Sequence, residues 1–445
     1  MFALALRSVR KRPGRFAATL LSAFLGAVVV MVFNSLHDTV VFGDVDPAGA
    51  EMLGIAAGVV GGYGTLLVFF AVASALTVNV RQRAAEIALL RSAGATPAQL
   101  RSTVVGEAVV VALAGTLLAA VPAALGGRLL LGLFQDGGQV ARDVEHVFGP
   151  IALGAGAATT LLASAGAALL AVHRAARDAA GARRSRGRAR TVMGCAALVA
   201  GAGGVATTFA LDPAAPALMA APAYGSILLA TGLALLSPAL LRALLGPVER
   251  AGGTPGGASV HLAVHNLRRN AARLSGILMP MVLFTGIATA TLSIQAAEND
   301  AMRASGVART ADDRTLETLN LTIVGIIVVF ACVMLVNSLY AATSHRRGEF
   351  GRQRLAGATP AQVLGTVGAE GVVLTAAGVL LGTVAGLAGT LAFTVVRTDE
   401  VLPDRGPAIW LGVAAVAAAA TLATSLATAR RALRVPAVRA AAVTA

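Results

Sequence analysis

Few side chains in this sequence are of a type that could do covalent or metal chemistry, and none stands in a catalytic or metal-binding motif. Lys11 is the only lysine among 445 residues, and it lies in an arginine-rich stretch. A phosphate-binding loop must end in Gly-Lys-Ser/Thr, so this chain cannot hydrolyse ATP through such a site. Cys195 and Cys332 fall in apolar runs, and the six histidines stand at the ends of such runs or in loops. The sequence therefore predicts a non-enzymatic chain with no catalytic, cofactor or metal site of its own.

One pattern of seven residues predicts a specific structure, because it occurs twice. Ala-Gly-Ala-Thr-Pro-Ala-Gln spans residues 93–99 and 356–362, an offset of 263 (356 − 93). Its threonine suits a helix N-cap, its proline the first helical position, and its glutamine the third, where it completes a capping box. Its glycine allows a sharp turn, and a short exposed helix is predicted to begin after each turn. The residues concerned are Gly94, Thr96, Pro97 and Gln99 in the first copy and Gly357, Thr359, Pro360 and Gln362 in the second.

Charged residues around the two copies repeat with the same offset. They are Glu86, Arg91 and Glu107 around the first copy, and Glu349, Arg354 and Glu370 around the second. Glu86 and Glu349 lie within reach of nearby arginines, where a pair would balance charge or orient the turn. Glu107 and Glu370 are interpreted either as interface residues that meet loop arginines or helix ends, or as relays of motion. A capped turn alone would be structural, but its duplication favours docking of a symmetric partner.

The composition indicates the setting of these elements. Hydrophobic residues make up 56% of the chain and charged residues 13%, with a mean hydropathy of +0.77, which is typical of a membrane protein. The net charge of +14 does not indicate nucleic-acid binding, because aromatic residues are only 4% and the arginines fall between apolar runs. Ten runs are long enough to cross a bilayer; they lie near 16–35, 54–78, 104–126, 150–172, 191–211, 222–245, 274–294, 319–340, 367–393 and 407–428.

Arginines concentrate in alternate loops, which predicts the orientation. Short cytoplasmic loops carry an excess of basic residues, and the N-terminus, the tail and both heptapeptide loops are basic, whereas the loop with Asp38 is acidic. We therefore expect a multi-pass protein of the cell membrane with both termini in the cytoplasm. The run from Arg183 to Arg190 is interpreted as an anchor that contacts anionic membrane lipids.

The predicted fold is an all-α polytopic membrane protein of about ten helices. Two four-helix repeats, residues 1–180 and 258–445, flank a two-helix insert over 181–257. The heptapeptide places the predicted short exposed helix near 95–103 in the first repeat and near 358–366 in the second. An even number of helices separates the copies, so a pseudo-twofold axis along the membrane normal is expected.

The segment RAAEIALLRSAGATP, residues 83–97, resembles the signature of FtsX-like permeases of MacB-type ABC transporters, and residues 346–360 are a looser match. In that family the segment is a coupling helix that docks on the cytoplasmic ATPase, and the four-plus-two-plus-four layout is similar to that of BceB-type permeases. Such permeases commonly carry a large extracytoplasmic domain. The connections over 36–53 and 295–318 are too short to form one.

The resemblance implies the membrane subunit of an ABC transporter. A separate cytoplasmic ATPase dimer would bind ATP-Mg and drive it. The short outer connections favour a hydrophobic or amphipathic cargo, a lipid or antibiotic-like molecule, and export is favoured over import because the sequence shows no evident docking surface for a binding protein. One alternative is a non-transporting signal transmitter, like FtsX, that activates an outer partner such as a cell-wall hydrolase. An ATP-independent carrier is disfavoured, because no ionisable residue is predicted deep inside a span.

Overall fold

The structure is a computed structural model, and its described residues form helices joined by turns, without a strand among them. These residues are 13–60, 65, 89, 92–178, 183–213, 216–250, 265, 267, 271–304, 325, 328–329, 331–333, 335–336, 339–340, 343, 346–398, 403 and 405–438. The chain divides into two compact units. The first comprises Met1–Arg183 with Ala308–Phe330, and the second Arg184–Val307 with Ala331–Ala445.

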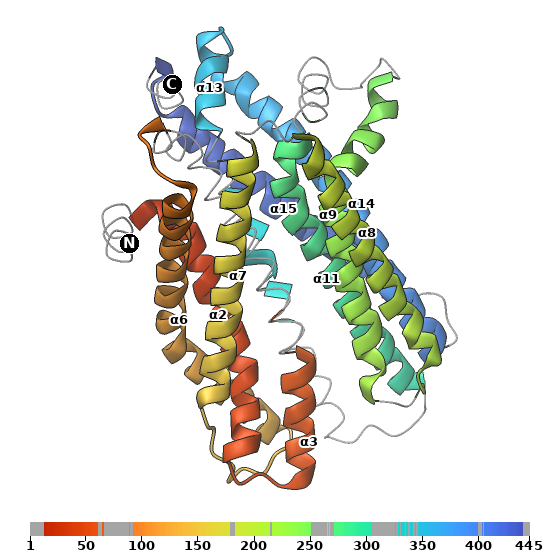
Figure 1. The fold of residues 1–445 in the computed structure, drawn as a ribbon. Helices are drawn as coiled ribbons and strands as arrows, with labels where there is room; N and C mark the ends of the chain where they lie inside the picture. The colour runs from red at the N-terminus through yellow and green to blue at the C-terminus, as the bar shows by residue number, and fades with distance from the viewer. Residues whose placement is uncertain are drawn as a thin grey trace. The chain divides into compact units, whose positions relative to one another are not determined.

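The first unit is built around three helices that pack against one another. They are α2 (Pro13–Phe42), α6 (Pro97–Asp136) and α7 (Pro150–Asp178). Each of the three contacts the other two, as Figure 1 shows. The short helix α3 (Pro47–Ile55) and the π-helical turn η1 (Ala56–Val60) follow α2 and contact it.

The second unit contains the same arrangement and two further long helices. Its equivalents of α2, α6 and α7 are α11 (Ala271–Ala304), α14 (Pro360–Thr398) and α15 (Gly406–Leu433), which again all contact one another. The nine-residue α13 (Arg347–Leu355) precedes α14 and packs on α14 and α15. The other elements are α8 (Arg183–Ala206), η2 (Thr207–Ala210), η3 (Pro216–Met219) and α9 (Ala220–Arg250). Because both three-helix sets match in order and in contacts, the internal duplication is present in the fold.

Glycines let the helices of the second unit approach closely. A Cβ at Gly382 of α14 would lie 2.6 Å from Thr285 Cβ and 2.9 Å from Gly286 N of α11. In the same way, a Cβ at Gly201 of α8 would lie 2.7 Å from Leu229 N of α9. Small residues at such seams permit the backbone contact on which helix association in a membrane depends.

Eight helices among the described residues are long and apolar enough to span a membrane. They coincide with eight of the ten predicted spans, which confirms a multi-pass membrane protein. The other two predicted spans, 54–78 and 319–340, lie mostly outside the described residues.

The helices after the two heptapeptide copies are longer than predicted. The sequence predicts a short helix at Pro97 and Pro360, separate from the spans near 104 and 367, and this is wrong. α6 and α14 run without a break for 40 and 39 residues. At 1.5 Å per residue each is about 60 Å long, about twice the thickness of a bilayer's hydrocarbon core. Each helix therefore continues from the heptapeptide through a whole membrane span.

Asp38 lies inside a helix rather than in the acidic loop where the sequence places it. α2 continues to Phe42, so Asp38 is fully buried. Its carboxylate accepts hydrogen bonds from Ile151 N at 3.0 Å and Ala152 N at 2.7 Å. These N–H groups belong to the first turn of α7, where they have no partner within the helix and favour a negative charge. Asp38 thus caps α7.

His146 lies in the loop before α7, at the end of the first unit where α6 finishes, and the stability of this end is expected to depend on pH. Its Nε2 lies 3.0 Å from Ser35 Oγ, and its pKa is lowered by burial and by Arg128, against an opposing effect of Asp38. The unfolded chain therefore binds a proton more readily than the folded one, and stability should be full above about pH 6.5 and fall below it. We expect the melting temperature to drop between pH 7.5 and pH 5, and to drop less for His146→Gln. Equal drops in the two proteins would contradict this assignment.

Candidate docking site

The two heptapeptide copies, 93–99 and 356–362, form turns of the same backbone geometry; we call them the first and second heptapeptide turns. Gly94 has φ of 92° and Gly357 has φ of 95°. This left-handed region costs little for glycine and is unfavourable for residues with a Cβ. The prediction that each glycine makes the turn is confirmed.

The helix after each turn begins with the predicted capping box. In the first turn, Gln99 N donates to Thr96 Oγ1 at 3.3 Å, and Thr96 N donates to Gln99 Oε1 at 2.9 Å. Gln362 and Thr359 make the same two bonds at the same distances in the second turn. Pro97 and Pro360 are the first residues of α6 and α14. Both helix starts are therefore fixed by local hydrogen bonds.

The second turn also closes the helix before it. Ala358 N donates to Gln353 O at 3.0 Å, and Gly357 N donates to Arg354 O at 3.1 Å. This is the pair of bonds of a Schellman motif, with Gly357 as its left-handed residue. α13 and α14 consequently form a tight helical hairpin whose tip is the second heptapeptide turn.

Four side chains gather at the open end of that hairpin. The Arg346 guanidinium, just before α13, binds both carboxylate oxygens of Glu370 in α14, with Nη2 and Oε1 3.2 Å apart. Its Nε donates to Glu349 at 2.9 Å, and its Cζ lies 5.5 Å from the ring centre of Phe350. Burial alone would lower the pKa of Arg346, but Glu370 and Glu349 raise it above its ordinary value. The arginine is therefore held as a cation in a largely buried place.

Arg354 joins the α13–α14 hairpin to α15. Its Nη1 donates to the carbonyl oxygens of Leu433 at 3.1 Å and Val435 at 2.9 Å, at the end of α15. The last carbonyls of a helix lack partners within it and attract positive charge. Figure 1 shows α13 beside this end of α15.

Apolar contacts complete the support beneath both turns. Val363 and Val367 of α14 pack with Phe350 of α13 and with Ala429 and Ala432 of α15. In the first unit, Leu100 and Val104 of α6 pack with Ala167 and Ala168 of α7. Residues 100 and 104 are the counterparts of 363 and 367 at the offset of 263. Each turn thus stands on a packed base rather than on a loose loop.

The tips of the turns are exposed and uncharged. Thr96 and Gln99 are exposed in the first turn, as are Thr359, Pro360 and Gln362 in the second. Leu355, directly before the second turn, is 57% exposed. A rigid, neutral tip with polar and small apolar groups suits a protein partner, since interface centres are depleted in charge.

The other predicted site residues fall in three groups. Glu86 and Arg91 lie outside the described residues. Glu107 is buried in α6, at the position equivalent to Glu370. Glu349 and Glu370 bind Arg346 at the open end of the α13–α14 hairpin, and Arg354 binds the end of α15, so none of the three lies at the tip. The sequence missed the role of Arg346, although its basic loop was noted, and it missed the ring of Phe350.

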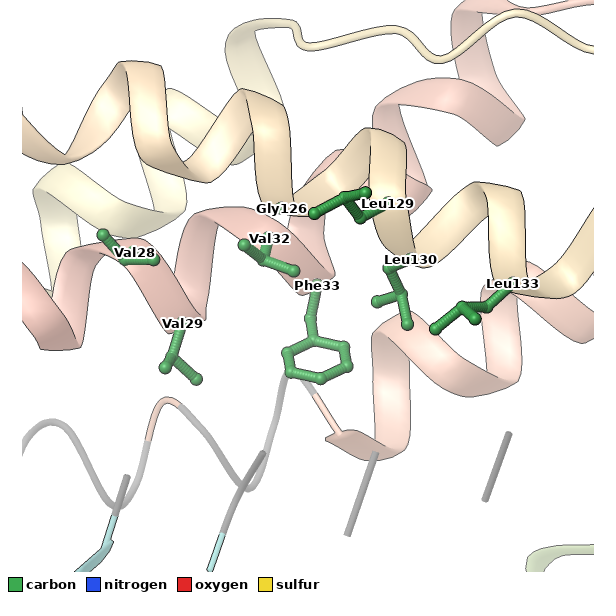
Figure 2. Close-up of a pocket in the computed structure, with 8 residues that line it drawn as sticks. All are labelled: Val28, Val29, Val32, Phe33, Gly126, Leu129, Leu130 and Leu133. Carbon is green, nitrogen blue, oxygen red and sulfur yellow. The ribbon is translucent and has the colours of Figure 1, made fainter. Parts of the chain in front are cut away.

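An apolar groove lies between α2 and α6 of the first unit, away from the heptapeptide turn. Its volume is about 210 Å³, and Figure 2 shows side chains of both helices around it. The lining residues are Val28, Val29, Val32 and Phe33 of α2 and Gly126, Leu129, Leu130 and Leu133 of α6. A groove lined by these residues offers hydrocarbon contacts to a ligand.

Comparison with known proteins supplies a family for this arrangement. A family model described as FtsX-like permease C-terminal matches residues 58–177 and 321–437, which is more than half of the chain. Each matched segment contains one heptapeptide turn and the long helix that follows it. No curated protein matches the chain.

Proposed function

This chain belongs to the FtsX-like permease family and is a membrane permease component of an ABC-type system, and on that premise we propose that a separate cytoplasmic ATPase drives it through the two heptapeptide turns. The observation that carries the proposal is the repeated turn itself. Two exposed tips have the same sequence, the same left-handed glycine and the same capping bonds. A partner with two equivalent grooves, such as an ATPase dimer that binds ATP-Mg, is expected to bind two such tips.

The continuous helices offer a route for work done at the turns. An ATPase that moves Pro97 or Pro360 pushes on the first turn of a helix that runs on to Asp136 or Thr398. A packed helix moves as a rigid element and repacks at its interfaces. Closure of the ATPase dimer would therefore change packing along α6 and α14 in their own units. For this to happen both turns must face the cytoplasm, as the arginine distribution predicts.

The cargo that fits best is hydrophobic or amphipathic, a lipid or an antibiotic-like molecule taken from the bilayer and exported. The apolar groove between α2 and α6 supports this class, because its lining can make only dispersion and hydrophobic contacts. The connection from α2 to α3 is only four residues, 43–46, which leaves no room there for a folded substrate-binding domain.

A second candidate function is transmission of ATPase motion to an outer partner such as a cell-wall hydrolase, without transport. One observation favours it: the last turn of α14 is fixed to α11 by Arg397, whose Nη2 lies 2.8 Å from Glu298 Oε1. Movement of α14 would thus reach the end of the unit opposite the turn. ATPase-driven cargo movement in vesicles that contain only the two subunits would exclude this alternative.

The proposal is tested by replacing the Thr-Pro pairs in the full chain. We expect Thr96→Ala, Pro97→Ala, Thr359→Ala and Pro360→Ala together to weaken binding of a co-expressed ATPase by about tenfold or more and to remove its stimulation, because losing both caps loosens both tips. Copurification and ATP hydrolysis measure this. Thr207→Ala with Pro213→Ala is the control, since both residues are exposed between α8 and α9. Intact docking in the fourfold variant would disprove the coupling role.

A further inference from the structure

α13 is too short to hold its own position. An isolated helix of fewer than about 12 residues is marginal in water, and α13 has nine. It is polar over most of its length, and Phe350 is the aromatic side chain that it contributes to the apolar base. Its placement must therefore come from tertiary contacts: the packing of Phe350, the bonds from Arg354 to the end of α15, and the contacts at the two ends of α13.

The contacts at those ends are of different kinds. Beyond its C-terminal end, the Schellman motif at Gly357 fixes the turn through backbone bonds. Before its N-terminal end stands Arg346, whose bond to Glu370 crosses to α14. Glu370 is ten residues after Pro360, about 15 Å along the helix, and the nine residues of α13 span about 14 Å. The lengths match, so the pair closes the hairpin opposite its turn.

The chemistry of the pair suits positioning more than stability. Arg346 and Glu370 side chains are 14% and 2% exposed, and moving two charges out of water offsets much of their attraction. A guanidinium that binds two carboxylate oxygens does, however, fix direction as well as distance. Glu349 and the Phe350 ring hold the same guanidinium from other sides.

We propose that Arg346 and Glu370 form a latch that fixes α13 against α14 and thereby positions the second heptapeptide turn for its partner. Neither residue would touch that partner, so both are positioning residues. The docking part rests on the proposed function, whereas the latch itself does not. Arg83 and Glu107 occupy the equivalent positions in the first unit, but Arg83 lies outside the described residues, and the latch is proposed for the second unit alone.

Hydrogen exchange in the full-length permease without ATPase tests the latch. In Glu370→Gln the amides of residues 347–356 should exchange about tenfold faster or more, since the largely buried Arg346 would lose its charged partner on α14 and keep its bond to Glu349, which lies on α13 itself. Arg346→Lys keeps the charge but not the two-oxygen geometry, and it should give a smaller rise. Glu298→Gln removes the pair with Arg397 at the other end of α14 and should leave α13 unchanged. Exchange within twofold of wild type in Glu370→Gln, or an equal rise in Glu298→Gln, would overturn the latch.

ATPase binding by the same variants tests the positioning role. At a temperature where all variants are folded, Glu370→Gln should weaken binding by about tenfold, and Glu298→Gln should not. Faster exchange with unchanged binding would overturn positioning and leave only a structural pair. If the wild-type permease bound no ATPase, the proposed function would fail, while the exchange measurement would still decide the latch. Should Glu370→Gln not accumulate, Arg346→Lys provides the same two readouts.

Discussion

Valine at both Gly94 and Gly357 is expected to abolish stimulation of the ATPase. Each glycine has φ above 90°, where a β-branched residue costs about 1–3 kcal/mol. The turn would relax to another conformation, the bonds from Gly357 and Ala358 to α13 would break, and the tip would move. Apart from its neighbours along the chain, no atom of the described residues lies within 4 Å of a Cβ placed on either glycine, so the expected effect comes from the backbone conformation. ATP hydrolysis with and without the permease measures it.

Asparagine at the same two positions is the matched control. Asparagine also adds a Cβ but tolerates the left-handed region far better than valine. We expect Gly94→Asn with Gly357→Asn to keep most of the stimulation. Either valine alone should weaken ATPase binding by more than half of the effect of the double variant. A partner that binds at two sites loses its avidity when one site fails. Full stimulation by the double valine variant would show that the turns are not the docking elements.

The local features of the site were predictable from the sequence because their causes lie within seven residues. A threonine, a proline and a glutamine at fixed spacing can satisfy the first N–H groups of a helix without help from the rest of the chain. The glycine before them supplies the positive φ that the turn needs. The capping boxes at Thr96 and Thr359 and the turns at Gly94 and Gly357 therefore agree with prediction.

Features set by tertiary packing were not predictable in the same way. Glu370 is 24 residues from Arg346 along the chain, and only the hairpin brings them together. The sequence left Glu370 open between an interface pair and a relay, and the structure places it in a pair. Asp38 was misplaced because hydropathy alone ended α2 near residue 35, whereas a buried carboxylate that caps α7 lets the helix continue. The length of α6 and α14 was missed because a run of apolar residues marks the membrane span but not the turns that extend the helix beyond it.

Valine at Gly382 is expected to lower the melting temperature of the permease strongly. A Cβ there would lie 2.9 Å from both Gly286 N and Val282 O of α11, which are backbone atoms that only a shift of the whole helix can move. Overpacking where two helices lie this close costs about 1–3 kcal/mol. Apart from the Arg397–Glu298 pair at one end, the contact between α11 and α14 depends on such close packing. Gly412→Val in α15 is the control, since within the part of the chain that the structure describes nothing beyond its own helix lies within 4 Å of its Cβ position. The melting temperature of Gly412→Val should change little. Equal losses in both variants would contradict the role assigned to the close contact of α11 and α14 at Gly382.

The same variant separates docking from the transmission of motion. Gly382 lies 22 residues after Pro360, and the second heptapeptide turn is held by bonds within its own hairpin, so the turn should keep its shape when the seam opens. At a temperature below its melting point, Gly382→Val should then still bind the ATPase but stimulate it less, because α14 would no longer carry α11 with it. Loss of ATPase binding would mean that the contact of α11 and α14 at Gly382 supports the second heptapeptide turn itself. Unchanged binding with unchanged stimulation would mean that the work of the ATPase does not pass between α14 and α11.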